Sequence, residues 1–127
     1  MTPFFIQDDT PRKLRVPDDI DKTQHRNGVT GIAGIMTAVR DLKSGVERYR
    51  AILEDGPQQQ DVMTADFALG QFTITLVAPT GDDADLGDYL TKRGEVPYKL
   101  WLWTDQADKA GALDTTLTHG TPIELMG

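Results

Sequence analysis

Two hydrophobic periods in one short chain restrict its fold to an architecture in which strands pack against helices. Apolar and polar residues alternate over residues 63–78, with Gly70 at the centre, which predicts a β-hairpin that turns near this glycine. Over residues 42–53 the apolar side chains recur at helical spacing instead, and Asp41 can cap the helix that this spacing predicts. Residues 55–57, with the sequence Asp-Gly-Pro, end that helix. We therefore expect an α+β domain.

Further strands and helices are expected on both sides of these elements. The mostly apolar run over residues 28–39 suits a strand buried on both faces, in which Gly31 and Gly34 leave room for a neighbouring group. Residues 84–93 predict a short helix that a glycine ends. Residues 97–104 carry bulky side chains on both faces, as a central strand does.

The two ends of the chain complete the expected order. Asp105 can cap a last helix that closes near His119, before a terminal strand over residues 122–125. At the other end, residues 2–6 predict a strand and residues 7–27 a polar linker. The expected order is β, β, α, β, β, α, β, α, β, with residues 1–27 as an N-terminal strand and linker and residues 28–127 as the main domain.

The amino-acid composition limits which reactions the chain can catalyse and which partners it can bind. Its 127 residues fit one domain and include no cysteine, which excludes disulfides, thiolate zinc sites and thiol nucleophiles. The formal net charge of -7 opposes binding to nucleic-acid phosphates and to anionic lipid surfaces. No run approaches the roughly 18 apolar residues of a membrane span, and the N-terminus lacks the basic flank of a secretion signal. We expect a cytoplasmic protein that binds neither nucleic acid nor membranes.

Two long segments carry a family resemblance. The strand and helix GIMTAVRDLKSGVERYRAIL and the later segment ITLVAPTGDDADLGDYLTKRGEVPYKLWLWTDQADKAGALDTTL look like the pattern of the glyoxalase or vicinal-oxygen-chelate superfamily, and in particular like methylmalonyl-CoA epimerases. The resemblance implies βαβββ modules that form a curved mixed sheet around a pocket, with helices on the outer face. The piece TPFFIQDD is similar to the last strand of a module. The second module is therefore expected to be incomplete, or to be completed by the N-terminal strand.

The same resemblance implies a divalent metal site, and this chain lacks its ligands. By position, the first-strand histidine of the family falls at Gly34, the Gln or Glu that ends the first module falls at Thr75, and the second histidine falls at Lys99. A fourth ligand would lie in a final strand that is absent, or that is supplied by the segment near Ile6, where no carboxylate stands. Glycine has no side chain and an ammonium group repels cations, so we expect no metal cofactor.

One face of the strand over residues 97–104 is the candidate binding surface. It carries Lys99, Trp101 and Trp103. By the family comparison this face looks into the pocket together with Gly34, Met36, Thr73 and Thr75. A lysine between two indoles could hold a flat or anionic small molecule by charge and stacking. The competing interpretation is that the indoles pack a core or a subunit interface while Lys99 reaches solvent.

The remaining polar motifs have simpler structural explanations. His25 and His119 are the two histidines, and a polar loop and a helix C-terminus explain them better than general-base chemistry does. An acidic cluster is formed by Asp82, Asp83, Asp85 and Asp88. Its spacing does not match a calcium-binding loop, and helix capping explains it better. The segment GVTGIAG follows a linker rather than a strand, so it is not a dinucleotide fingerprint.

Three functions fit these observations. The first is a metal-independent protein that binds a small organic ligand in a sheet-lined pocket. The second is a lyase or isomerase in which Lys99 acts as a base or as an electrostatic stabiliser, which requires a desolvated Lys99 with a partner. The third is a structural or interaction domain that uses its Trp face as an interface. In each case the exposed edge of an incomplete sheet favours a homodimer.

Overall fold

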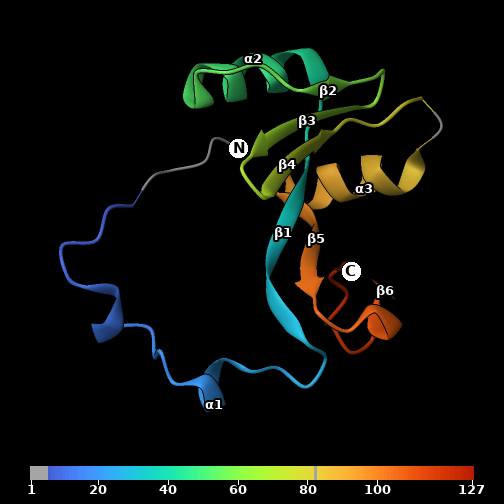
Figure 1. Ribbon diagram of the computed structural model, residues 1–127. Coiled ribbons are helices and arrows are strands. Elements are labelled where there is room, and N and C mark those ends of the chain that lie inside the picture. The colour runs from blue at the N-terminus through green and yellow to red at the C-terminus, as the bar shows by residue number, and fades with distance from the viewer. Residues whose placement is uncertain (1–5, 82) are drawn as a thin grey trace.

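Strand β1 (Val29–Ala38) lies at the centre of a mixed sheet in the computed structural model, which describes residues 6–81 and 83–127 (Figure 1). From one edge to the other, the seven strands are β2 (Gln59–Gln60), β3 (Thr64–Leu69), β4 (Phe72–Val77), β1, β5 (Pro97–Thr104), β7 (Ile123–Met126) and β6 (Gly111–Ala112). The hairpin of β3 and β4, the central strand β5 and the terminal strand β7 form where the sequence predicts them. With the helices described below, they make up the predicted α+β architecture.

The two halves of the sheet repeat one arrangement of strands. In the first half β4 runs parallel to β1 and antiparallel to β3, and in the second half β7 runs parallel to β5 and antiparallel to β6. Strands β1 and β5 pair antiparallel where the halves meet. The first half is a full βαβββ module, whereas no α-helix separates β5 from β6. The second module is therefore incomplete, as predicted, but its last strand is β7 from the C-terminal end of the chain.

Helix α2 (Leu42–Leu53) forms where the sequence predicts it and covers one face of β3 and β4. The carboxylate of Asp41 caps the helix, because it accepts hydrogen bonds from the Ser44 amide and hydroxyl at 2.8 and 2.6 Å. Tyr49 of the helix is buried against Phe67 of β3, with the ring centroids 5.9 Å apart. This aromatic pair belongs to the larger of two buried apolar clusters.

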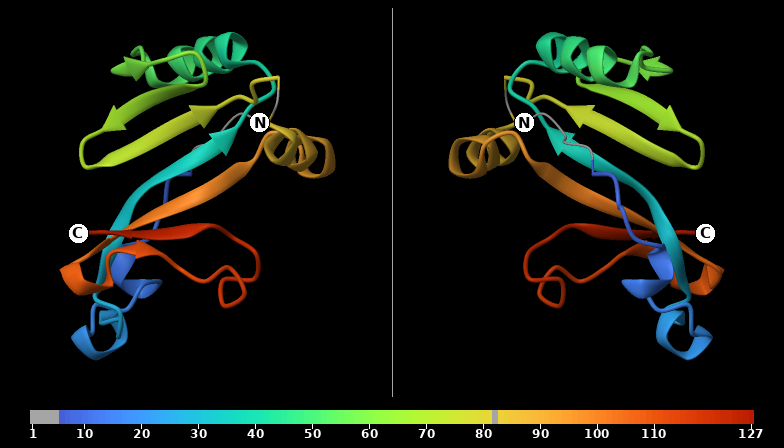
Figure 2. Two further views of the ribbon diagram at one scale, coloured as in Figure 1. Left: turned by 90° about the vertical axis from the view of Figure 1, so that its right-hand side faces the viewer. Right: turned by 90° about the vertical axis from the view of Figure 1, so that its left-hand side faces the viewer.

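Helix α3 (Ala84–Arg93) packs against the ends of β1 and β4. Leu86 and Leu90 are buried there with Ala38 and Val77. Because side chains alternate between the faces of a strand, Ala38 and Val77 lie on the face that α2 does not cover. Figure 2 shows α3 beside the end of β1 and the start of β5. Within the described ranges, no helix combines the length and the apolar character needed to cross a membrane.

The predicted last helix over residues 105–119 is wrong. The chain instead forms a 3-10 turn η2 (Ala107–Lys109), the strand β6 and a series of turns. The Leu113 amide donates to the Ile123 carbonyl at 2.8 Å, so this segment follows the edge of β7 rather than coiling. Asp114 accepts hydrogen bonds from both the amide and the hydroxyl of Thr116. Such local bonds, together with stiff β-branched side chains, compete with helix formation.

The N-terminal segment runs outside the sheet (Figure 1), and residues 6–26 are exposed. It contains a 3-10 turn η1 (Arg12–Leu14) and a short helix α1 (Ile20–Thr23). Its end is fixed to the turn after β5, where the Thr104 hydroxyl donates to the Asn27 carbonyl at 2.9 Å. The strand predicted over residues 2–6 lies outside the described residues except for Ile6, which is exposed and irregular.

Strands β1 and β4 approach each other closely at Gly34. A Cβ atom at this position would lie 2.5 Å from the carbonyl oxygen of Thr73, closer than real side chains approach. Strand β1 also shifts its register against β5 between Ile32 and Gly34, as β-bulges do. The space that Gly34 leaves is thus filled by the backbone of β4. Gly31 differs, because nothing lies within 4 Å of the place where its Cβ would stand.

Replacing Gly34 by alanine should therefore destabilise the protein more than the same change at Gly31. The added methyl group of Gly34→Ala forces β1 and β4 apart, and overpacking of this kind costs about 1–3 kcal/mol of unfolding free energy. Gly31→Ala, on the same strand, should change that free energy by no more than about 0.5 kcal/mol. Urea unfolding followed by circular dichroism measures both. Equal midpoints for the two variants would contradict the close approach.

Candidate functional site

Three neighbouring strands, β4, β1 and β5, bring the residues of the predicted binding face together. The register of the sheet arranges them in two rows, one of Thr75, Met36 and Lys99 and the next of Thr73, Gly34 and Trp101. Register partners on neighbouring strands project to the same face. Trp103 follows two residues beyond Trp101 on β5 and extends the face toward the end of that strand. The face predicted from the sequence is therefore a continuous surface.

Lys99 is paired with a carboxylate that sequence analysis did not identify. Its Nζ atom lies 2.5 Å from Oε2 of Glu124 on β7, and the Trp101 indole N–H donates to the same oxygen at 3.2 Å. The Lys99 and Glu124 side chains are 28% and 32% exposed, so water covers only part of the pair. The ammonium group also lies 5.3 Å from the centroid of the Trp101 ring, within cation–π range. Lys99 is thus partly desolvated and has an acidic partner.

Glu124 reaches Lys99 because β7 pairs in parallel with β5, which places Glu124 opposite Trp101. The hydrogen bond from Lys99 and its positive charge lower the pKa of Glu124, burial opposes this effect, and the Trp101 N–H adds to the lowering. Glu124 is therefore a carboxylate at neutral pH. The family resemblance implies an acid in the last strand of the second module, which was expected near Ile6, and in the structure that strand is β7. The sequence signal for Glu124 is that it is the one acidic residue in the otherwise apolar strand predicted over residues 122–125.

A second polar pair lies across the same face. The Thr75 hydroxyl donates to Oδ1 of Asp66 on β3 at 2.6 Å. Thr75 is only 7% exposed, and Asp66 is half-buried. Asp66 was also missed, because it occupies a polar position of the alternating hairpin that solvent exposure explains equally well. One row of side chains thus crosses the sheet from Asp66 to Lys99.

A shallow pocket of about 210 Å³ opens beside these pairs. It is lined by Ala33, Thr73, Thr75, Trp101, Trp103 and Met126. Trp103 and Met126 are 36% and 37% exposed, so they form a rim that solvent reaches. The indole, thioether and methyl surfaces of these residues suit an apolar group.

The resemblance assigns three of the metal-ligand positions of the superfamily to Gly34, Thr75 and Lys99 in this chain. Gly34 offers no donor, and Lys99 directs its ammonium group at Glu124. The Thr75 hydroxyl is bound to Asp66. Within residues 6–81 and 83–127, no three His, Cys, Asp or Glu side chains gather in a group that could hold a metal ion. The donors present do not fit a divalent cation, so no chemical step is assigned to one.

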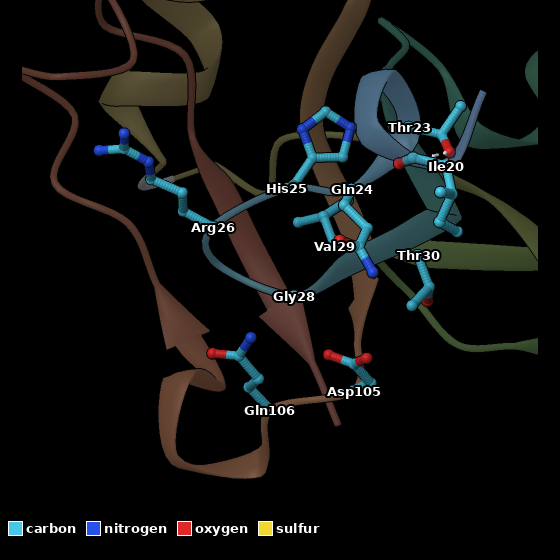
Figure 3. Close-up of a pocket in the computed structure, with 10 residues that line it drawn as sticks. All are labelled: Ile20, Thr23, Gln24, His25, Arg26, Gly28, Val29, Thr30, Asp105 and Gln106. Carbon is cyan, nitrogen blue, oxygen red and sulfur yellow. Dashed lines mark hydrogen bonds between the residues drawn. The ribbon is translucent and has the colours of Figure 1, made fainter. Parts of the chain in front are cut away.

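The two histidines lie away from this face. His25 lines a polar pocket of about 550 Å³ between the N-terminal segment and the turn after β5 (Figure 3). Its ring projects away from Asp105 and Gln106, which lie on the other side of that pocket in Figure 3. His119 lies in the turns after β6, in a left-handed backbone conformation with φ 54°, and not at the predicted helix end.

The acidic cluster supports helix α3, as predicted. Asp83 caps the helix by accepting a hydrogen bond from the Leu86 amide at 3.1 Å. Asp85 lies in the first turn, and Asp88 pairs with Lys92 one turn further on, at 3.0 Å. Asp82, the remaining member, lies outside the described residues.

Comparison with solved structures identifies the fold of the chain. No family model matches the chain, and no curated protein matches its sequence. The methylmalonyl-CoA epimerase of Mycobacterium tuberculosis superposes with a TM-score of 0.65 at 20% identity, over 80% of this chain and 90% of that one. A variant of the Streptomyces coelicolor enzyme in complex with 2-nitronate-propionyl-CoA gives a TM-score of 0.60 at 21% identity, over 76% and 93%.

A hypothetical protein from Bacillus halodurans is similar to the same extent, with a TM-score of 0.60 at 14% identity, over 74% of this chain and 91% of that one. Methylmalonyl-CoA epimerases belong to the glyoxalase or vicinal-oxygen-chelate superfamily. The fold that the sequence resemblance implied is therefore confirmed. At these identities the similarity is one of fold, and the site must be interpreted from its own residues.

The pairing of Glu124 with Lys99 predicts a pH dependence of stability. A carboxyl whose pKa is lowered by folding stabilises the protein at pH values above its unfolded pKa of about 4.5, and this contribution is lost as the pH falls through the folded pKa. Thermal melting between about pH 7 and about pH 3 should therefore fall less steeply for Glu124→Gln than for the wild type. Glu47→Gln removes an exposed acid from α2 and should leave the wild-type slope unchanged. Parallel curves for all three proteins would refute the ion pair.

Proposed function

We propose that this chain binds a small, flat organic molecule in the pocket between Trp101 and Trp103, without a metal ion. The observation that carries the proposal is the pocket itself, which two tryptophans and two threonines line on one sheet face. Its volume of about 210 Å³ lies below the roughly 300–1,000 Å³ of pockets that enclose drug-sized ligands. A ligand of one or two rings, or one such part of a larger ligand, suits this space.

The polar groups around the pocket favour an uncharged ligand over an anion. Glu124 already neutralises the ammonium of Lys99 and also occupies the indole N–H of Trp101. The Thr75 hydroxyl donates to Asp66, which leaves its oxygen as an acceptor. Stacking on the indoles would then supply most of the affinity, and the threonines would orient the ligand.

A screen of metal-free protein against small aromatic metabolites tests this proposal. A binding metabolite should raise the melting temperature and change the tryptophan fluorescence, since both tryptophans of the chain line the pocket. Trp103→Ala should weaken that binding by about tenfold, because an aromatic contact contributes about 0.5–1.5 kcal/mol beyond its area. Leu69→Ala, which removes another exposed apolar side chain from the far end of β3, should not.

The outcomes of this screen separate the proposal from its competitors. Unaltered binding in Trp103→Ala would remove the tryptophan pocket as the site. If no metabolite binds and the tryptophan emission changes with protein concentration instead, the face is an interface in a homodimer. Stabilisation by a divalent metal alone would contradict the metal-independent proposal.

The Lys99–Glu124 pair supports a second candidate, an isomerase or lyase of the same fold. A half-buried carboxylate next to an ammonium group can accept a proton from carbon while the cation stabilises the negative charge that develops on the substrate. The site then needs no metal ion to supply that charge. In this second candidate function the ligand binds in the same pocket, and the Lys99–Glu124 pair catalyses a reaction of the bound ligand.

Solvent deuterium distinguishes the enzyme from the binding protein. In deuterium oxide an isomerase of this kind should place deuterium on the carbon of a bound metabolite, which mass spectrometry detects. Glu124→Gln should abolish the incorporation because the amide cannot accept the proton, and Lys99→Met should lower it by about 10²-fold or more. Binding without incorporation in the wild type would leave the first proposal alone.

A further inference from the structure

A second pocket, of about 400 Å³, lies between the end of α3 and the turns that follow β6. Its lining includes Arg93 from α3, Tyr98 from β5, and His119 and Pro122 from the turns. It shares no lining residue with the tryptophan pocket. No carboxylate lines it among the described residues. The pocket is therefore a separate and basic feature of a protein with a net charge of -7.

The two basic side chains of this pocket, Arg93 and His119, have no partner within the described part of the chain. Neither the Arg93 guanidinium nor the His119 imidazole makes a hydrogen bond or an ion pair within the described part of the chain. The neighbouring Lys92, by contrast, pairs with Asp88. Elsewhere Arg48 pairs with Glu95 at 2.8 Å. The two basic side chains around this cavity are therefore free to bind a ligand of opposite charge.

An apolar wall completes the pocket. Tyr98 contacts Tyr89 edge to face, with ring centroids 4.9 Å apart. The Tyr89 hydroxyl donates to the Pro97 carbonyl at 2.6 Å, which fixes that ring against the start of β5. Pro122 also lines the cavity. The body of a ligand could pack on these rings while its charged end meets the two bases.

The turn that carries His119 is held in place by its own hydrogen bonds. The Gly120 amide donates to the Thr115 carbonyl at 2.8 Å, and the Thr118 hydroxyl donates to the Thr121 carbonyl at 2.5 Å. His119 has φ 54°, in the left-handed region that few residues other than glycine adopt. These bonds hold the backbone of the turn at His119 in a strained conformation, as is often found at binding sites.

The C-terminal end of a helix ordinarily repels anions, but the end of α3 is shielded. The Leu90 carbonyl accepts hydrogen bonds from the Gly94 amide at 2.9 Å and from the Arg40 guanidinium at 3.2 Å. Lys92 and Arg93 add positive charge to the last turn. The negative end of the helix dipole is therefore compensated where the pocket begins.

From these observations we infer that this pocket binds an organic anion, with its charged group between Arg93 and His119 and its apolar body against Tyr98 and Pro122. A carboxylate and a phosphate ester share the required chemistry. Arg93 offers a planar set of N–H donors that matches either group. The site is independent of the proposed tryptophan pocket.

The two histidines allow a direct test by NMR. Benzoate and phenyl phosphate should each be titrated into the protein while the imidazole protons are followed, with His25→Gln used to assign the signals. The His119 signals should shift and saturate, whereas those of His25, in a different pocket, should stay in place. The probe that saturates at the lower concentration identifies the carboxylate or the phosphate ester as the preferred group. Benzamide, the uncharged analogue of benzoate, should have no effect.

Variants complete the test. Arg93→Gln should weaken binding by about tenfold or more, since a hydrogen bond to a charged group contributes about 1.5–3 kcal/mol. Lys43→Gln, which removes one exposed positive charge from α2, should leave it unchanged. His119→Asn tolerates the left-handed backbone and should weaken binding without unfolding the protein. Shifts that are absent, that rise linearly for both histidines, or that persist in Arg93→Gln would overturn the assignment, whatever the tryptophan pocket binds.

Discussion

The structure depends on one strand, β1, which belongs to both halves of the sheet. Its second half pairs in parallel with β4, while nearly its whole length pairs antiparallel with β5. At Gly34, strands β4 and β5 both lie next to β1. The Thr73 carbonyl of β4 fills the place of a side chain on one side, and Trp101 of β5 lies opposite Gly34 on the other. A side chain at this point would separate the two rows of residues that form the candidate face. The site is therefore built on the backbone geometry of a single glycine.

Sequence predicted the elements whose stability is local and failed where pairing between distant segments decided the structure. Helix α2 carries its own cap at Asp41, and the hairpin turns at Gly70 with φ 67°, so both could be identified from neighbouring residues. Residues 105–119 have apolar residues at helical spacing, yet pairing with β7 overrides that signal. Alternation along β5 predicted that Lys99, Trp101 and Trp103 share a face, and the family resemblance added the residues of β1 and β4. Neither of these located Glu124, because only the register of β7 brings it to Lys99.

The paired charges change what the site can do. An unpaired Lys99 would attract anions, whereas a Lys99 held at 2.5 Å from Glu124 presents a nearly neutral surface next to two indoles. The Arg93 guanidinium lines the second pocket instead, together with Tyr98 and His119, and no ion pair engages it among the described residues. The apolar candidate surface and the second pocket are therefore separate, although both include residues of β5. A fold shared with epimerases carries no information about this division, which comes from the side chains.

The central place of β1 also sets an order of assembly during translation. Strand β5 follows β1 only after α2, the hairpin and α3, so the ribosome releases every partner of the first half before it releases β5. Until then the edge of β1 that β5 will cover, including Ile32 and Ile35, is open in the nascent chain. Open strand edges invite pairing with other chains. The speed at which residues 78–104 are synthesised therefore determines how long this edge of β1 stays open in each new molecule.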